Sequence, residues 1–186
     1  MGIGIALMAG ADLGLGPWDV LHQGLSFRTD LSLGLLNIAV GAVVLGLWVP
    51  LRQRPGIGTI LNVLIIGLVV DATLALLPHL DPLWLRTPAM LAGVLLMGVG
   101  SGLYIGAGLG PGPRDGLMTG VAARGHTVRS VRTALELTVL ALGWALGGTV
   151  GVGTLVLAVA IGPLVQAALE RLGLPAPSPA GEPAAR

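Results

Sequence analysis

Two copies of one short motif hold the residues whose types and spacing could do chemistry. Both read Gly-x-Gly-Pro-x-Asp; one copy runs from Gly14 to Asp19 and the other from Gly110 to Asp115. Glycine allows backbone conformations that interrupt a helix, and proline suits the first position of the next helix, where its missing N–H is no loss. We therefore predict one helix break in each copy, at Gly14, Gly16 and Pro17 and at Gly110, Gly112 and Pro113.

The aspartate that closes each motif is predicted to lie in the first turn of the new helix. The helix dipole and the free N–H groups favour a carboxylate there, so a structural cap is the favoured reading of Asp19 and Asp115, and substrate or ion binding is the alternative. An acid at the positive helix end disfavours a simple anion site; a cationic, zwitterionic or proton-coupled ligand fits better. Trp18 of the first copy is replaced by Arg114 in the second. We expect Arg114 to anchor at the cytoplasmic face rather than to pair with an acid.

Two further polar residues lie in apolar stretches and are binding candidates. Asp71 follows Gly67-Leu-Val-Val, and a carboxylate within a membrane span is costly and therefore a functional candidate. It is either a proton carrier or, because Pro78 is close behind it, a residue near the end of the span that faces headgroups; both readings stay open. Asn62 is expected to hydrogen-bond across helices.

The remaining polar residues predict no metal or catalytic site. Glu136 follows Arg132 at a spacing of four, which indicates a structural ion pair. His22 has no second ligand at metal spacing, and cysteine is absent. Neither a nucleophile–base pair nor a metal cluster is visible, so we expect no enzyme activity and no cofactor.

The elements that must position these residues are apolar helices. Of the 186 residues 54% are hydrophobic and 10% charged, against about 25% charged residues in a soluble domain. A lipid bilayer is therefore the expected partner, and the net charge of +1 gives no reason to expect nucleic acid. A span takes about 20 residues, and stretches of nearly that length or longer with at most one charge lie at 33–50, 59–78, 87–109, 133–150 and 151–169.

The chain is predicted to be an internal repeat. With a shift of 96 residues, eight of the fifteen positions in 11–25 are identical to those in 107–121. Trp48 and Trp144 share that register, and after a one-residue adjustment 56–59 matches 151–154. Repeats of this kind are sought before other patterns because they decide the fold. We predict membrane repeats at 1–78 and 79–174, and a disordered cytoplasmic tail at 175–186. Met1 aligns with a mid-helix residue of the second copy, so the first opening helix is expected to be truncated.

The fold class predicted is all-α: a transmembrane bundle of about six spans, in two inverted three-helix repeats that each carry a short re-entrant helix of about two turns. Two arginines lie in one set of connecting segments and eight in the other, so the second set, with both termini, is expected to be cytoplasmic. An odd number of spans per copy makes the repeats inverted. The rival count, in which 17–32 and 113–130 span the membrane, gives parallel repeats. Glycines at every fourth residue from Gly98 to Gly110 also predict close packing of the two opening helices.

At these motifs the chain resembles the bacterial YczE/YitT-type integral membrane proteins. The resemblance rests on Asp-Leu-Gly-Leu-Gly-Pro-Trp-Asp-Val-Leu from Asp12, on Leu-Arg-Gln-Arg-Pro-Gly-Ile-Gly-Thr-Ile-Leu-Asn from Leu51, and on Ile66, Gly67 and Asp71. It implies a multi-pass protein of the bacterial plasma membrane and gives no assigned substrate.

Two functions fit these features. The first is a small secondary transporter or exporter of a small molecule, because paired broken segments at matching positions of two halves are typical of a transporter's binding site. Asp19, Asp115 and Asp71 would then handle a cation or protons. The second is a non-transporting scaffold or accessory subunit of a larger complex. The sequence does not predict the oligomeric state.

Overall fold

The computed structural model describes residues 1–173, and in that part of the chain every regular element is an α-helix. The tail predicted at 175–186 lies outside the described residues. The eight helices are α1 (Gly2–Ala11), α2 (Pro17–Thr29), α3 (Leu33–Leu51), α4 (Ile57–Leu76), α5 (Leu83–Gly106), α6 (Pro113–Ala122), α7 (Val128–Ala145) and α8 (Val152–Arg171). The all-α fold class is confirmed.

Four of these helices, α3, α4, α5 and α8, are long and apolar enough to cross a membrane. Their most apolar windows have mean hydropathies of 1.7 to 2.2. The other two predicted spans differ from this group: α1 has ten residues, and α7 carries Arg129, Arg132 and Glu136. The count of six spans therefore stays a prediction.

Both helix interruptions lie at the Gly-x-Gly-Pro motifs. Gly14 and Gly110 each have a φ of 115°, a conformation that glycine adopts without strain and that other residues avoid. Pro17 and Pro113 then begin α2 and α6. The backbone thus has the same conformation at the first glycine of both motifs, and a new helix begins three residues later.

The helices that follow the breaks are longer than expected. We predicted about two turns for each, but α2 has 13 residues and α6 has 10. In the last turn of α2 the Arg28 guanidinium donates to the Leu146 carbonyl at 3.2 Å, and Asp30, with a φ of 55°, ends the helix.

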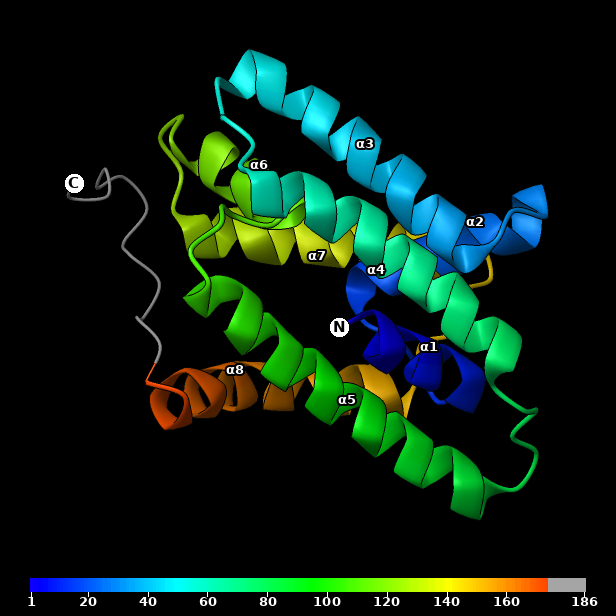
Figure 1. Ribbon diagram of the computed structural model, residues 1–186. Coiled ribbons are helices and arrows are strands. Elements are labelled where there is room, and N and C mark those ends of the chain that lie inside the picture. The colour runs from blue at the N-terminus through cyan, green and yellow to red at the C-terminus, as the bar shows by residue number, and fades with distance from the viewer. Residues whose placement is uncertain (174–186) are drawn as a thin grey trace.

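Helix α1 packs between α4 and α5 near the middle of the molecule (Figure 1). The backbones of α1 and α5 come closest at Gly4 and Gly93, where a side chain on either glycine would overlap the carbonyl of the other. The predicted packing of the two opening helices therefore exists, but the residues were wrong: Gly98 and Gly102 face Leu164 and Ala168 of α8. Every fourth residue of a helix follows one face, and that face of α5 is turned toward α8.

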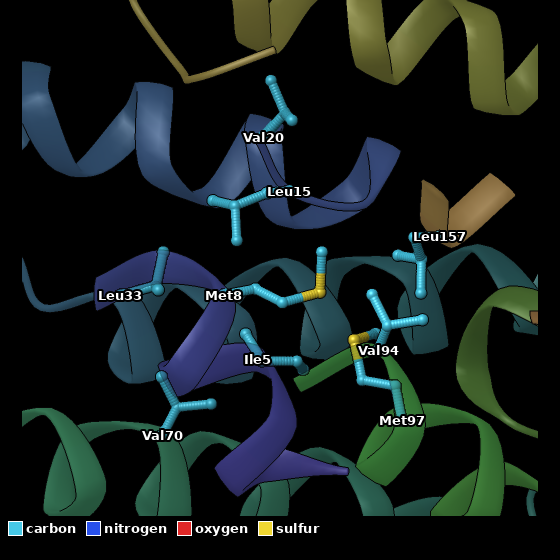
Figure 2. Close-up of a cluster of buried hydrophobic side chains, with 9 residues drawn as sticks. All are labelled: Ile5, Met8, Leu15, Val20, Leu33, Val70, Val94, Met97 and Leu157. Atoms are coloured by element: carbon cyan, nitrogen blue, oxygen red, sulfur yellow. The ribbon is translucent and has the colours of Figure 1, made fainter. Parts of the chain in front are cut away.

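A cluster of buried apolar side chains joins helices from both halves of the chain. Figure 2 shows Ile5 and Met8 of α1 in the middle of it. Val70 of α4, Val94 and Met97 of α5 and Leu157 of α8 surround them. This cluster fixes α1 against the long helices and so fixes the position of the first helix break.

The connecting segments fall into two groups at opposite ends of α3. At one end, the Thr149 hydroxyl donates to Asp12 at 2.8 Å, and Arg86 and Arg28 bond to the backbone around Ala11 and Leu146. At the other end, Arg124 donates to the Pro50 carbonyl at 2.9 Å, and the Gly58 N–H donates to the Leu109 carbonyl at 3.0 Å. With 19 residues, α3 separates the two groups by about 28 Å.

Candidate functional site

A cavity of about 960 Å³ lies where α2 and α6 begin. Its lining includes most of the predicted site: Gly16, Pro17, Trp18, Asp19, Asn62, Gly112, Pro113, Arg114 and Asp115. Gly14, Gly110 and Asp71 are not part of its wall. Because the two motifs are 96 residues apart in the sequence, only the packing of the two halves brings them together.

Asp19 is buried and already paired. Its residue is 1% exposed, and its Oδ1 lies 3.4 Å from the Arg114 guanidinium of α6 and 3.5 Å from Nδ1 of His22, one turn further along α2. The expectation that Arg114 anchors at the cytoplasmic face was wrong. Arg114 is the second residue of α6, and that helix begins beside the start of α2, so its side chain reaches an acid.

The Arg114 guanidinium also lies over the indole ring of Trp18, 5.2 Å from the ring centroid. Such a cation–π contact adds roughly 0.5–2 kcal/mol, depending on how far the pair is desolvated. Trp18 and Arg114, which occupy matching positions of the two motifs, thus contact each other. Trp18 and Arg114 join the starts of α2 and α6, and this contact positions Asp19.

Asp115, the counterpart of Asp19, is in a different state. Its residue is exposed and lines the cavity, and its carboxylate turns back toward the backbone of Gly112. Within residues 1–173 no arginine or histidine nitrogen lies within 4.0 Å of it. One aspartate of the pair is therefore neutralised inside the protein, and the other presents a carboxylate to the cavity.

Two more polar pairs line the same wall. Arg132 and Glu136 form the predicted ion pair, with Nε and Oε1 2.9 Å apart, so that prediction is confirmed. The Gln166 amide donates to Glu170 at 2.8 Å. The cavity wall thus combines apolar helix surfaces with carboxylates that mostly have their own partners.

Three buried polar atoms of the described residues have no hydrogen-bond partner, and all three belong to side chains of this cavity wall. They are Nε1 of Trp18, the hydroxyl of Tyr104 and Nδ1 of His22, whose 3.5 Å contact with Asp19 Oδ1 does not have hydrogen-bond geometry. Trp18 is 7% and His22 2% exposed. A buried polar group without a partner costs about 1–3 kcal/mol, so such groups call for an explanation.

Asp71 lies apart from this cavity. Its Oδ2 accepts from the Ser32 hydroxyl at 2.6 Å and its Oδ1 accepts from the Gly34 N–H at 2.7 Å. Ser32 is the N-cap of α3, so Asp71 fixes the start of α3 against α4. It lines a second cavity of about 460 Å³ with Ser32, Ser26 and Gln23.

Sequence reasoning missed several polar residues of the wall. His22 was considered only as a metal ligand, although its spacing of three from Asp19 places both on one helix face. For the charges of α7, Arg132 and Glu136, a structural ion pair was favoured over a catalytic role, and a place in a binding site was not considered. Tyr104, Asn37 and Glu170 carried no signal, because only the fold brings them to the cavity.

The comparisons with known proteins support the conclusion that this is a membrane protein. The model of a family of unknown function, DUF6198, matches residues 1–170. The chain belongs to the DUF6198 family. The family resemblance seen in the sequence is confirmed for YczE: the uncharacterized membrane protein YczE of Bacillus subtilis is 36% identical over 172 residues, which cover 91% of this chain and 80% of that protein.

Two other proteins match over similar lengths. An uncharacterized protein of Haemophilus influenzae is 41% identical over 167 residues, 89% of this DUF6198 chain and 77% of that protein. The uncharacterized protein YyaS of Bacillus subtilis is 26% identical over 160 residues, 83% of this chain and 80% of that protein. No solved structure matches the chain.

Proposed function

We propose that this protein is a small secondary transporter whose substrate site is the cavity between the starts of α2 and α6. One observation carries the proposal: two interrupted helices from matching positions of the chain meet at a cavity of about 960 Å³, and their charged side chains line it. Non-helical backbone at membrane depth is tolerated where protein or a watery cavity covers it. Paired broken helices at midplane sites are a recurrent transporter design.

The proposed architecture is an inverted repeat of six spans, counted as α1, α3, α4, α5, α7 and α8. Equivalent contacts support it. The Gly58 N–H donates to the Leu109 carbonyl, and its counterpart Gly153 donates to the Leu13 carbonyl. Gly2 packs on Val69 as Gly98 packs on Leu164. The helices α2 and α6 begin together at the Asp19–Arg114 pair and run to opposite ends of α3.

We further propose a bacterial plasma-membrane location with both termini in the cytoplasm. The end of the molecule that holds Arg52, Arg54 and Arg124 carries most of the arginines, and an excess of arginine marks the cytoplasmic side. We expect the protein to move its ligand without chemical change, so no catalytic residue is assigned.

Uptake into proteoliposomes tests the transport function. The purified protein is reconstituted, and a mixture of amines, amino acids, organic acids and sugars is offered outside while internal contents are measured by mass spectrometry. We expect at least one compound to accumulate beyond the level in protein-free liposomes. Asp19→Asn and Asp115→Asn should each lower its flux at least about tenfold and remain monodisperse, whereas Asp81→Asn, in an exposed loop, should not change it.

A scaffold gives the opposite result. No compound of the mixture would enter faster than through bare lipid, with either orientation of the protein or with a pH gradient of either sign. The substitutions at Asp19 and Asp115 would then change only folding or the capture of a partner subunit from solubilised membranes. That outcome would remove the transporter proposal.

A further inference from the structure

The cavity has more negative than positive side chains, and only some of its carboxylates form ion pairs. Four carboxylates line it, from Asp19, Asp115, Glu136 and Glu170, against the two guanidinium groups of Arg114 and Arg132. Arg114 pairs with Asp19 and Arg132 pairs with Glu136. Neither guanidinium is left without a carboxylate. Met1, which carries the α-amino group, also lines the cavity, so the four carboxylates outnumber the guanidinium and amino groups by one.

The two motif aspartates differ in whether they are neutralised, and one sequence difference causes this. Arg114 stands where the first motif has Trp18, and it crosses to neutralise Asp19. Trp18 carries no charge, so it cannot neutralise Asp115 in the same way. Asp115 is therefore the motif aspartate that is exposed to the cavity without an ion-pair partner among residues 1–173. Glu170 also lacks an ion-pair partner there, but it accepts a hydrogen bond from the Gln166 amide.

The unpartnered polar atoms independently indicate that the wall is incomplete without a ligand. Nε1 of Trp18 has no partner, and Nδ1 of His22 has only the 3.5 Å contact with Asp19 Oδ1, which is not a hydrogen bond by geometry. Both side chains are more than nine-tenths buried and line the cavity. Indole offers a hydrogen-bond donor, and the neutral imidazole offers either a donor or an acceptor at Nδ1. A ligand with polar atoms beside its charge would supply the missing partners.

The rest of the lining is apolar and comes from several helices. Ile66 of α4, Met97 of α5 and Leu157 of α8 contribute to it. Small-molecule sites commonly combine such apolar walls with a few placed polar groups. The ligand must therefore carry an apolar body as well as a charge.

We propose that the cavity binds a small amphiphilic amine, with the protonated amine on the Asp115 carboxylate and the apolar body between α4, α5 and α8. Asp19, held by Arg114, acts as a positioning residue. This inference names the substrate class of the proposed transporter and rests on that function for its meaning. Binding can nevertheless be measured without transport, so the two proposals can fail separately.

The test compares three probes that share an aromatic body and differ in charge: phenethylamine, phenethyl alcohol and phenylacetate. Binding is measured as the rise in unfolding temperature of the full chain in phosphatidylglycerol nanodiscs. We expect phenethylamine to bind at least about tenfold more tightly than the other two, because a charge-assisted hydrogen bond to a partly desolvated carboxylate is strong. Equal or tighter binding of the alcohol or the acid, or binding of none of the three, would overturn the proposal.

Substitutions locate the binding group. Asp115→Asn should lose at least about tenfold in affinity for phenethylamine, Asp115→Glu should keep most of it, and Asp81→Asn in the exposed loop should keep all of it. Asp19→Asn should also weaken binding, because it frees Arg114 to pair with Asp115. If Asp115→Asn does not fold, the probe comparison on the unaltered protein still decides, and unchanged affinity in a folded Asp115→Asn protein would refute the assignment.

Measuring phenethylamine binding again in nanodiscs that contain phosphatidylethanolamine distinguishes two sources of the amine. Competition by this lipid, seen as weaker phenethylamine binding, would identify a lipid headgroup as the natural occupant. Unchanged binding would identify a free small amine. Either result supports an amine site, while uptake of an anion or a sugar in the transport assay would leave a transporter and remove the amine assignment.

Discussion

Arg114 is the residue whose environment decides how the two motifs differ. Its side chain is 32% exposed, and it serves an aspartate side chain that is only 2% exposed. A buried carboxylate that loses its counter-ion is strongly destabilising, whereas an exposed ion pair contributes little. The Arg132–Glu136 pair is the comparison, because both of its side chains are more exposed: Arg132 is 57% and Glu136 34% exposed.

We predict that Arg114→Gln lowers the free energy of unfolding by about 1–3 kcal/mol, and that Arg132→Gln lowers it by at most about 1 kcal/mol. The measurement is the midpoint of unfolding in detergent. The double substitution of Arg114→Gln with Asp19→Asn should recover part of the loss, since it also removes the uncompensated charge. Equal effects of the two arginine substitutions would show that the Asp19–Arg114 pair is not an internal ion pair.

The sequence identified both aspartates but could not identify their partners. Asp19 and Asp115 follow from local spacing, because Gly-x-Gly-Pro fixes where a new helix begins. The Asp19–Arg114 contact joins residues 95 positions apart in the chain, and it depends on the starts of α2 and α6 meeting. Asp71 illustrates the reverse case: its position in an apolar stretch suggested either a proton carrier or a residue that faces headgroups, and the structure gives it Ser32 and Gly34 at the start of α3.

At the scale of elements, each helix break is held by the start of a helix from the other half of the chain. The Thr59 hydroxyl at the start of α4 accepts from the Gly56 N–H at 3.1 Å and donates to the Pro111 carbonyl at 2.7 Å. The equivalent Thr154 of α8 accepts from Gly151 at 3.3 Å. Thr59 is thus the threonine that bonds to the other half of the chain, and it does so beside the second break.

We predict that Thr59→Val lowers the free energy of unfolding by about 1–2 kcal/mol, because it loses two hydrogen bonds and leaves the Pro111 carbonyl without its donor. Thr154→Val, of the same shape, should cost about 0.5–1 kcal/mol, since it loses one longer bond. Thermal unfolding of the two variants side by side makes the comparison. A larger loss for Thr154→Val would mean that the second break does not depend on the Thr59 contact.

The apolar runs predicted most elements well, and polar residues caused the errors. The stretches at 33–50, 59–78 and 87–109 became α3, α4 and α5 with modest shifts of their ends. The stretch at 133–150 did not: α7 begins at Val128, with its N-cap at Thr127, and ends at Ala145. The Thr127 hydroxyl accepts from the Ser130 N–H and starts the helix early, before the apolar run.

For the whole molecule, the decisive feature is which ends of the helices lie on the same side. Hydrogen bonds place the end of α2 beside Leu146, and Thr149 of the same segment shares Asp12 with Arg86. The end of α6 bonds to Pro50. The sequence predicted this grouping from the count of spans and from the arginines. In parallel repeats α2 and α6 would point to the same side of the membrane.

Cysteine labelling tests the inverted arrangement directly, because the chain contains no cysteine and each introduced thiol is the only one. Asp30→Cys and Asp81→Cys report on one end of the molecule, and Pro55→Cys and His126→Cys report on the other; all four positions are exposed. We predict that a membrane-impermeant maleimide labels the first pair in intact cells and the second pair only in inverted vesicles. Pro55 and Asp81 lie at the two ends of α4, so they calibrate the two sides independently of the repeats. If positions 30 and 126 react from the same side, α2 and α6 do not enter from opposite faces, and the cavity loses its place at the centre of an inverted transporter.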